Sequence, residues 1–139
     1  MAGYSGTPLF KKLGIKSGFD VAFVNAPEGF VDHLELPADV RLRSISKSRE
    51  LDLLLVFAKR QTVLADAFAR HAEKIKANGM FWVSWPKKTS GVATDLTENV
   101  VRDIGLAAGL VDVKVCAVDD VWSGLKFVYR VRDRAALKF

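Results

Sequence analysis

One nearly continuous apolar run, LDLLLVFA from Leu51 to Ala58, constrains the fold more than any other part of this sequence. A strand that is apolar on both of its faces is normally covered on both, as in the parallel sheet of an α/β protein. Apolar residues then recur with helical spacing from Arg60 to Asn78, and Gly79 marks the expected end of that helix. A buried strand followed by a helix is half of a βαβ unit, so the sequence predicts a sheet with helices on its faces.

The same alternation of strand and helix patterns runs through the rest of the chain. Five further strands are predicted, at Phe19–Asn25, Val40–Ser46, Met80–Trp85, Val111–Val118 and Leu125–Val131. Three further helices are predicted, a short one ending at Gly14, a second that starts at Pro27, and a third from Asp95 to Ala108. The fold class that follows is a three-layer α/β sandwich whose mostly parallel, Rossmann-like sheet ends in an antiparallel hairpin strand.

The start of the third helix carries a capping signal. Asp95 and Glu98 have the spacing of a capping box, with Asp in place of the more usual Ser or Thr. The carboxylate of Asp95 is therefore predicted to cap its own helix.

Length and composition describe an ordinary globular chain. The 139 residues, half of them apolar, predict a single domain over residues 1–139. There is one cysteine, Cys116, and no apolar run has the length of a secretory signal or of a membrane span of about 18 residues. These features predict a cytoplasmic protein with no membrane partner.

The charge balance favours anionic partners. The formal net charge is +5 and the predicted pI is about 9.5. The basic residues are scattered rather than gathered into a stripe with interleaved aromatic residues, which is the usual pattern of a nucleic-acid surface. An anionic small molecule is the favoured partner, with a protein partner as an alternative and nucleic acid as the least favoured.

Four predicted loops meet at one edge of the expected sheet. Ligands of open α/β sheets bind outside the carboxyl ends of the strands. The loops on this edge are NAPEG, KRQT, PKKTSG and DDVWSG, and they carry the cationic residues Lys59, Arg60, Lys87 and Lys88. Three of the loops lead into helix N-termini, which favour anions.

We therefore predict an anion-binding site at this edge, centred on the loop after Trp85. Its candidate residues are Asn25, Glu28, Lys87, Lys88, Thr89, Ser90, Trp122 and Ser123. The alternative is that these polar loops are plain connections between strand and helix.

The nucleotide-binding fingerprints are absent. The first strand is followed by VNAPEGF, which lacks the G-x-G that lets a backbone approach a dinucleotide or S-adenosylmethionine, and Pro27 removes an N–H. The PKKTSG loop lacks the framework of a P-loop. No cofactor is predicted, and S-adenosylmethionine is expected to bind weakly or not at all.

The usual catalytic residue types form no set. His33 and His71 lack metal-ligand spacing, and Cys116 lies in the middle of a predicted strand, as a small buried residue would. No serine lies in a G-x-S-x-G motif. The sequence therefore predicts no metal site and leaves any catalytic residues unknown.

The motifs NAPEGF, WPKKTSGVATDLTE and DDVWSGLKFV resemble a bacterial family of short proteins, the domain-of-unknown-function family 3052. That resemblance covers nearly the whole chain and implies no activity. A more distant similarity is to the core of S-adenosylmethionine-dependent methyltransferases. LGIKSGFDVAFVN is similar to its first helix and strand, and the closing helix, strand and hairpin are similar to its C-terminal half. The similarity implies that fold, while NAPEG replaces the glycine-rich turn of the cofactor site.

Three functions remain open from the sequence. The first is a small binding or regulatory module for an anionic ligand or protein partner at the carboxyl edge of the sheet. The second is a degenerate or unusual methyltransferase-like enzyme. The third is a basic protein associated with nucleic acid. The sequence does not decide whether the protein is an enzyme.

Overall fold

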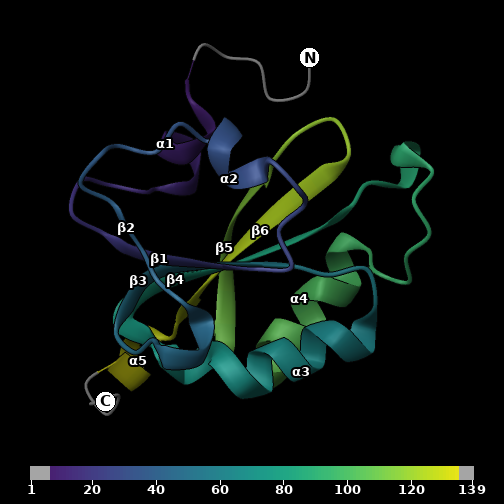
Figure 1. Ribbon diagram of the computed structural model, residues 1–139. Helices are drawn as coiled ribbons and strands as arrows, with labels where there is room; N and C mark the ends of the chain where they lie inside the picture. The colour runs from purple at the N-terminus through teal and green to yellow at the C-terminus, as the bar shows by residue number, and fades with distance from the viewer. Residues whose placement is uncertain (1–6, 135–139) are drawn as a thin grey trace.

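The computed structural model describes residues 7–134, which form a six-stranded sheet with helices on both faces (Figure 1). The strands are β1 (Asp20–Val24), β2 (Arg41–Leu42), β3 (Leu51–Phe57), β4 (Ile75–Pro86), β5 (Leu110–Ala117) and β6 (Trp122–Tyr129). Their order across the sheet is β2-β1-β3-β4-β6-β5. Strands β1 to β4 are parallel, while β6 runs antiparallel to both of its neighbours, β4 and β5. The predicted fold class is confirmed.

Helices form the outer layers. They are α1 (Leu9–Leu13), α2 (Phe30–His33), α3 (Gln61–His71), α4 (Glu98–Ala107) and α5 (Val131–Arg134). Short 3-10 turns add η1 (Ile45–Lys47), η2 (Ala72–Lys74) and η3 (Lys88–Ser90). Figure 1 places α3 and α4 together on one face of the sheet and α1 and α2 on the other. Within residues 7–134 no helix has both the length and the apolar character needed to cross a membrane.

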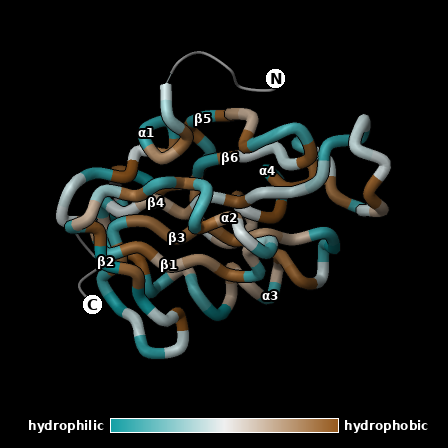
Figure 2. The backbone as a smooth tube through the Cα atoms, turned by 45° about the horizontal axis from the view of Figure 1, so that its top comes forward, coloured by the Kyte–Doolittle hydropathy of each residue, from teal (hydrophilic) through white to brown (hydrophobic). Residues whose placement is uncertain are grey.

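The central strand β3 divides its side chains between two apolar cores. Leu54 and Val56 join the core beneath α3 and α4, whereas Leu55 and Phe57 join the core beneath α1 and α2. All four are 0–1% exposed, and β3 is brown along much of its length in Figure 2. This confirms that β3 is covered on both faces, which is why its sequence lacks the alternation of a half-exposed strand.

The predicted helix from Arg60 to Asn78 is too long. The α-helix stops at His71, and the chain enters β4 at Ile75 after one 3-10 turn. Ile75 pairs with Leu51, and the register of the β3–β4 ladder shifts before Met80 pairs with Leu53. The residues expected to finish the helix therefore form the first part of an irregular strand.

Gly79 serves this irregular strand rather than a helix end. A Cβ atom built on Gly79 would lie 2.9 Å from the carbonyl oxygen of Leu51 and 3.0 Å from the backbone N and O of Lys76. Only glycine allows three backbone segments to approach so closely. Gly79 therefore meets a packing requirement within β4 and does not end α3.

Other boundaries also differ from the sequence prediction. The strand expected over 40–46 is reduced to β2, because only Arg41 and Leu42 pair with β1. The last strand begins at Trp122 and ends at Tyr129, so Trp122 and Ser123 belong to β6 and not to the hairpin loop.

The N-termini of two helices also differ from their predicted positions. Gly29, with φ +78°, precedes α2, so Pro27 lies before the helix and not in its first turn. Helix α4 begins at Glu98, where the side chain of Thr97 accepts a 3.3 Å hydrogen bond from the N–H of Val100. The capping box expected from Asp95 is thus wrong, because Asp95 lies outside the first turn of α4.

Candidate functional site

The strand order creates a crevice between β1 and β3. From β1 the chain moves outward to β2, and it then returns to β3 on the opposite side of β1. Such a reversal of winding direction is a topological switch point, where ligands of open α/β sheets usually bind. The structure therefore marks the carboxyl ends of β1 and β3 as the first place to look for a site.

A cavity of about 320 Å³ lies at this switch point. We call it the switch-point cavity; its lining residues are Asn25, Phe57, Ala58, Lys59, Arg60, Val63 and Trp122. Its volume is near the lower end of the roughly 300–1,000 Å³ of small-molecule sites. An apolar floor with a few polar groups at the rim is the usual composition of such sites.

Asn25 connects the two strands that form the cavity. Its backbone is left-handed, with φ +59°, a conformation that asparagine adopts more readily than other side chains with a Cβ. Its side-chain amide donates a 3.3 Å hydrogen bond to the carbonyl oxygen of Phe57 at the end of β3. Asn25 therefore helps to hold the switch point in shape.

Trp122 provides an aromatic wall. Its ring meets that of Phe57 edge to face, with centroids 5.1 Å apart and planes at 88°. The carboxylate of Asp119 accepts 2.8 Å hydrogen bonds from the N–H groups of Val121 and Trp122, which fixes the hairpin turn. The wall is thus held in place before any ligand binds.

Lys59 and Arg60 provide the positive charge at this cavity. Both side chains are exposed, and neither forms an ion pair within residues 7–134. Both residues lie on the edge predicted from the sequence, although neither is among the eight predicted site residues. Their proximity to Asn25 and Trp122 depends on strand order.

The N-terminus of α3 is already occupied by the protein's own carboxylate. The Asp95 carboxylate accepts a 2.8 Å hydrogen bond from the N–H of Gln61, and the Gln61 side chain donates to the Asp95 carbonyl oxygen at 3.0 Å. The Thr94 hydroxyl donates to the carbonyl oxygen of Lys59 at 2.7 Å. An anionic ligand in the switch-point cavity would therefore bind the side chains of Lys59 and Arg60 rather than the helix end.

The loop with Lys87, Lys88, Thr89 and Ser90 lies apart from the switch-point cavity, whose lining contains none of these four residues. The loop protrudes at the right of Figure 1. Hydrogen bonds within the loop and to the hairpin before β6 use groups that could have bound an anion. The Lys87 N–H donates to Val121 O at 2.8 Å, and the Ser90 hydroxyl donates to Lys87 O at 2.7 Å.

The remaining candidates, Glu28 and Ser123, lie elsewhere on the same edge. Glu28 lines a separate cavity of about 290 Å³ together with His33 and Asp119. Ser123 pairs with Trp85 in the β4–β6 ladder, and its carbonyl oxygen accepts a hydrogen bond from buried Ser84. Of the eight predicted residues, the structure brings only Asn25 and Trp122 to the switch-point cavity.

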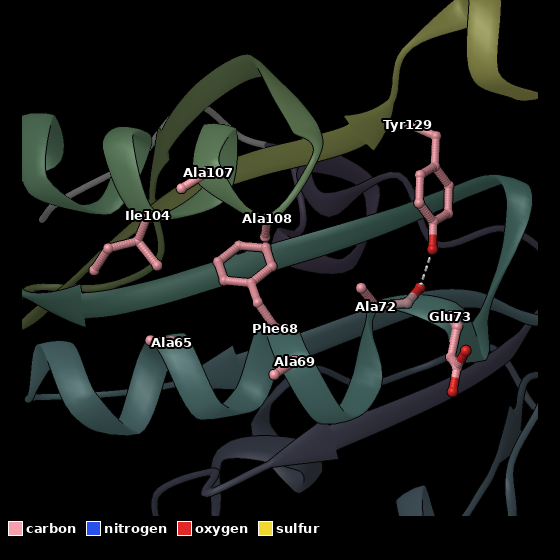
Figure 3. Close-up of a pocket in the computed structure, with 9 residues that line it drawn as sticks. All are labelled: Ala65, Phe68, Ala69, Ala72, Glu73, Ile104, Ala107, Ala108 and Tyr129. Atoms are coloured by element: carbon pink, nitrogen blue, oxygen red, sulfur yellow. Dashed lines mark hydrogen bonds between the residues drawn. The ribbon is translucent and has the colours of Figure 1, made fainter.

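A larger cavity lies between α3 and α4 (Figure 3), and it shares no lining residue with the switch-point cavity. Its volume is about 570 Å³, and alanines supply much of its lining. The Tyr129 hydroxyl donates a 2.5 Å hydrogen bond to the carbonyl oxygen of Ala72, and burial raises the pKa of Tyr129 to about 12. With Tyr129 already bonded, few polar groups remain to orient a ligand there, so volume does not identify the functional site.

Solved structures share this fold. A methyltransferase dependent on S-adenosylmethionine from Aquifex aeolicus aligns with a TM-score of 0.63 and 14% identity, covering 86% of each chain. Fibrillarin from Aeropyrum pernix, solved with natively bound S-adenosyl-L-methionine, gives a TM-score of 0.58 and 11% identity over 88% of this chain and 69% of its own. The chain has the Rossmann-like fold of methyltransferases.

A ribosomal protein L11 methylase from Lactobacillus delbrueckii gives a TM-score of 0.56 and 11% identity over 88% of this chain and 75% of its own. No protein-family model and no curated protein matches the sequence. Membership of the domain-of-unknown-function family 3052 therefore stays a prediction, whereas the methyltransferase-like core is confirmed as a fold.

Proposed function

We propose that this chain is a divergent methyltransferase-like protein that binds S-adenosylmethionine, or a related adenosyl ligand, in the switch-point cavity. The observation that carries the proposal is the position of that cavity at the carboxyl ends of β1 and β3. Its chemistry supports the same ligand class. Trp122 provides a surface for an adenine ring, and Lys59 and Arg60 provide positive charge for a carboxylate.

The local backbone argues that this ligand binds weakly. Pro27 lacks an N–H, and the turn from Asn25 to Gly29 contains a single glycine, so close backbone approach is restricted. An acidic residue near the end of the second strand commonly binds the ribose of dinucleotides. Here Arg43 and Ser44 follow β2 instead. We expect a dissociation constant above about 100 μM, corresponding to roughly 5.5 kcal/mol of binding free energy or less.

The lining also limits the chemistry. Among the described residues, neither a carboxylate nor a histidine lines the switch-point cavity, so these residues supply no general base of the usual kind there. A methyl acceptor would have to be nucleophilic without deprotonation by the cavity. The protein is therefore expected to bind the ligand, and to transfer its methyl group only to an acceptor that is already nucleophilic.

Calorimetric titration of the 139-residue chain with S-adenosylmethionine and S-adenosylhomocysteine tests the proposal. We expect one weak site per chain, and we expect the K59A/R60A double variant to lose most of the binding. The K11A/K16A variant removes the same charge elsewhere and should bind like wild type. A micromolar constant would mean that the missing glycine motif matters less than we infer. The absence of saturation at millimolar ligand would contradict the proposed ligand class.

A second candidate function is a binding module for an anionic small molecule such as a phosphate, in place of an adenosyl ligand. It is favoured by one observation, the lack of ion-pair partners for Lys59 and Arg60 within the described residues. Saturable binding of inorganic phosphate or a nucleoside monophosphate, lost in K59A/R60A and without competition from S-adenosylmethionine, would favour this module over the adenosyl site.

A further inference from the structure

A second polar cavity lies at the opposite edge of the sheet. Its volume is about 540 Å³, and it forms where the amino ends of β1, β3 and β4 meet the segment that follows β2. We call it the amino-edge cavity. Most of its lining is charged or carries hydroxyl groups, including Asp20, Arg43, Ser44, Lys47, Arg49 and Lys76. This composition suits a charged ligand and not an apolar one.

The charges of the amino-edge cavity do not balance. Of the residues that the structure describes, four cationic side chains line it, those of Arg43, Lys47, Arg49 and Lys76, against the two carboxylates of Asp20 and Glu50. An excess of two positive charges in a concave site raises the local concentration of anions.

Asp20 and Asp52 are the acidic residues that form ion pairs in this region. The Asp20 carboxylate accepts from Arg41 Nε at 2.6 Å and from Arg43 Nε at 3.0 Å, so one negative charge serves two guanidinium groups. The pKa of Asp20 is held below its usual range, with the Arg41 hydrogen bond as the largest cause. Lys76 is paired with Asp52 at 3.0 Å, just beyond the lining residues.

Lys47 and Arg49 remain without such a partner. Both are exposed, and neither forms an ion pair or a side-chain hydrogen bond within the part of the chain that the structure describes. Lys47 and Arg49 are therefore available to bind an anion. Arg43, which shares the Asp20 carboxylate with Arg41, lines the same cavity.

The segment that presents these cations is held in place by other residues. The Ser48 hydroxyl donates to Ser44 O at 2.5 Å, and Lys74 Nζ donates to Ile45 O at 2.9 Å. Glu50, with φ +58°, turns the chain sharply into β3. Because these contacts hold the backbone of the segment, binding of an anion orders mainly the side chains of Lys47 and Arg49.

We propose that the amino-edge cavity binds a di- or triphosphate group, with Lys47 and Arg49 as its principal contacts. Guanidinium and ammonium groups form charge-assisted hydrogen bonds with phosphate oxygens, and Arg43 and Ser44 are placed to add donors. Leu42, which is 56% exposed and lines the same cavity, offers an apolar contact to whatever carries the phosphates. The proposal does not depend on the ligand of the switch-point cavity, which lies at the other edge.

Titration with inorganic tripolyphosphate at about 50 mM salt, where screening is weak, tests this site. Wild type should show saturable binding, and K47A/R49A should bind at least tenfold more weakly. K59A/R60A is the matched control, since it removes the same charge from the switch-point cavity, and it should bind tripolyphosphate within about twofold of wild type. Melting temperatures without ligand should agree among the three proteins because all four side chains are exposed.

The outcomes separate this proposal from the proposed function. Equal losses in both double variants would indicate non-specific attraction to net charge and would overturn the site. No saturable binding by wild type, or unchanged binding by K47A/R49A, would overturn it as well. A parallel titration with adenosine triphosphate distinguishes the sources of the phosphate: tighter binding than tripolyphosphate indicates a nucleoside-carried group, and weaker binding indicates a free oligophosphate.

Discussion

The Asp95 carboxylate accepts a 2.8 Å hydrogen bond from the backbone N–H of Gln61, the first residue of α3, although 34 positions separate the two residues in the chain. Arg60, the residue before the helix, makes no side-chain cap of its own. Asp95 therefore caps α3 from a distant segment and fixes the turn that carries Lys59 and Arg60. This contact links the connection before α4 to the rim of the switch-point cavity.

Replacing Asp95 by alanine should destabilise the protein by about 1 kcal/mol, because removal of an N-terminal cap leaves an unsatisfied N–H and a helix end without its carboxylate. Urea unfolding followed by circular dichroism measures the change. Asp103→Ala is the control, since Asp103 is an exposed acid of α4 without an ion pair in residues 7–134. Equal stability of the two variants would show that the cap contributes nothing.

Gly105→Ala should also destabilise the protein, although the same change in an exposed helix normally stabilises by up to about 1 kcal/mol. Gly105 is buried in α4, and a Cβ there would overlap the ring of Phe127. Overpacking of this kind costs roughly 1–3 kcal/mol. Thermal and urea unfolding measure whether Gly105→Ala lowers or raises the stability of the protein.

A second substitution tests the cause. Phe127→Leu removes Cε1 and Cζ, the two ring atoms that would lie nearest to the new methyl group, so the double variant should lose less stability than the sum of the two single changes. Additive losses would place the strain of Gly105→Ala somewhere other than at Phe127.

The ion pairs of Asp20 should make stability depend on pH in the acid range. Arg41 holds the pKa of the Asp20 carboxyl below its usual value. The ionised carboxylate is therefore more stable in the folded protein than in the unfolded chain. The stabilisation is present above the unfolded pKa of about 4 and is lost as the pH falls through the lower folded value. Both arginines are about half exposed, so solvent screening keeps the effect small.

Asp20→Asn should accordingly be less stable than wild type at pH 7, and the gap between the two free energies of unfolding should shrink toward pH 3. Urea unfolding of both proteins at several pH values measures this difference in the free energy of unfolding. Asp32→Asn serves as the control, because the exposed Asp32 forms no ion pair in the described part of the chain. If the difference in the free energy of unfolding does not change with pH, the lower stability of Asp20→Asn has a cause other than the charge of the carboxylate.

Anion binding by the PKKTSG loop stays a prediction, with fewer groups to carry it. Its Lys87 N–H and Ser90 hydroxyl are already bonded, which leaves the two ammonium groups and the Thr89 hydroxyl for a ligand. The hypothesis predicts that phosphate raises the melting temperature of wild type more than that of K87A/K88A. The same rise in both proteins would mean that the loop is only a connection, and a rise lost in K59A/R60A alone would place the anion at the switch-point cavity.

Local periodicity determined much of this fold. The apolar run of β3 predicted a strand covered on both faces, and the alternation of patterns predicted the mostly parallel sheet, because burial and backbone hydrogen bonding leave a regular signal within a few residues of sequence. The loops at the carboxyl edge followed from the same reasoning. The sequence therefore places Lys59, Arg60 and Trp122 on that edge, without showing which residues they contact.

Tertiary structure alone decided which of these residues meet. The strand order β2-β1-β3-β4-β6-β5 brings Asn25 and Trp122 to one cavity and leaves the loop with Lys87 outside it. The same is true of Asp95, whose spacing to Glu98 indicated a local cap while its carboxylate binds Gln61. A local pattern records what each segment must bury, whereas contacts between distant segments depend on the order and register of the strands, which no short stretch of sequence contains.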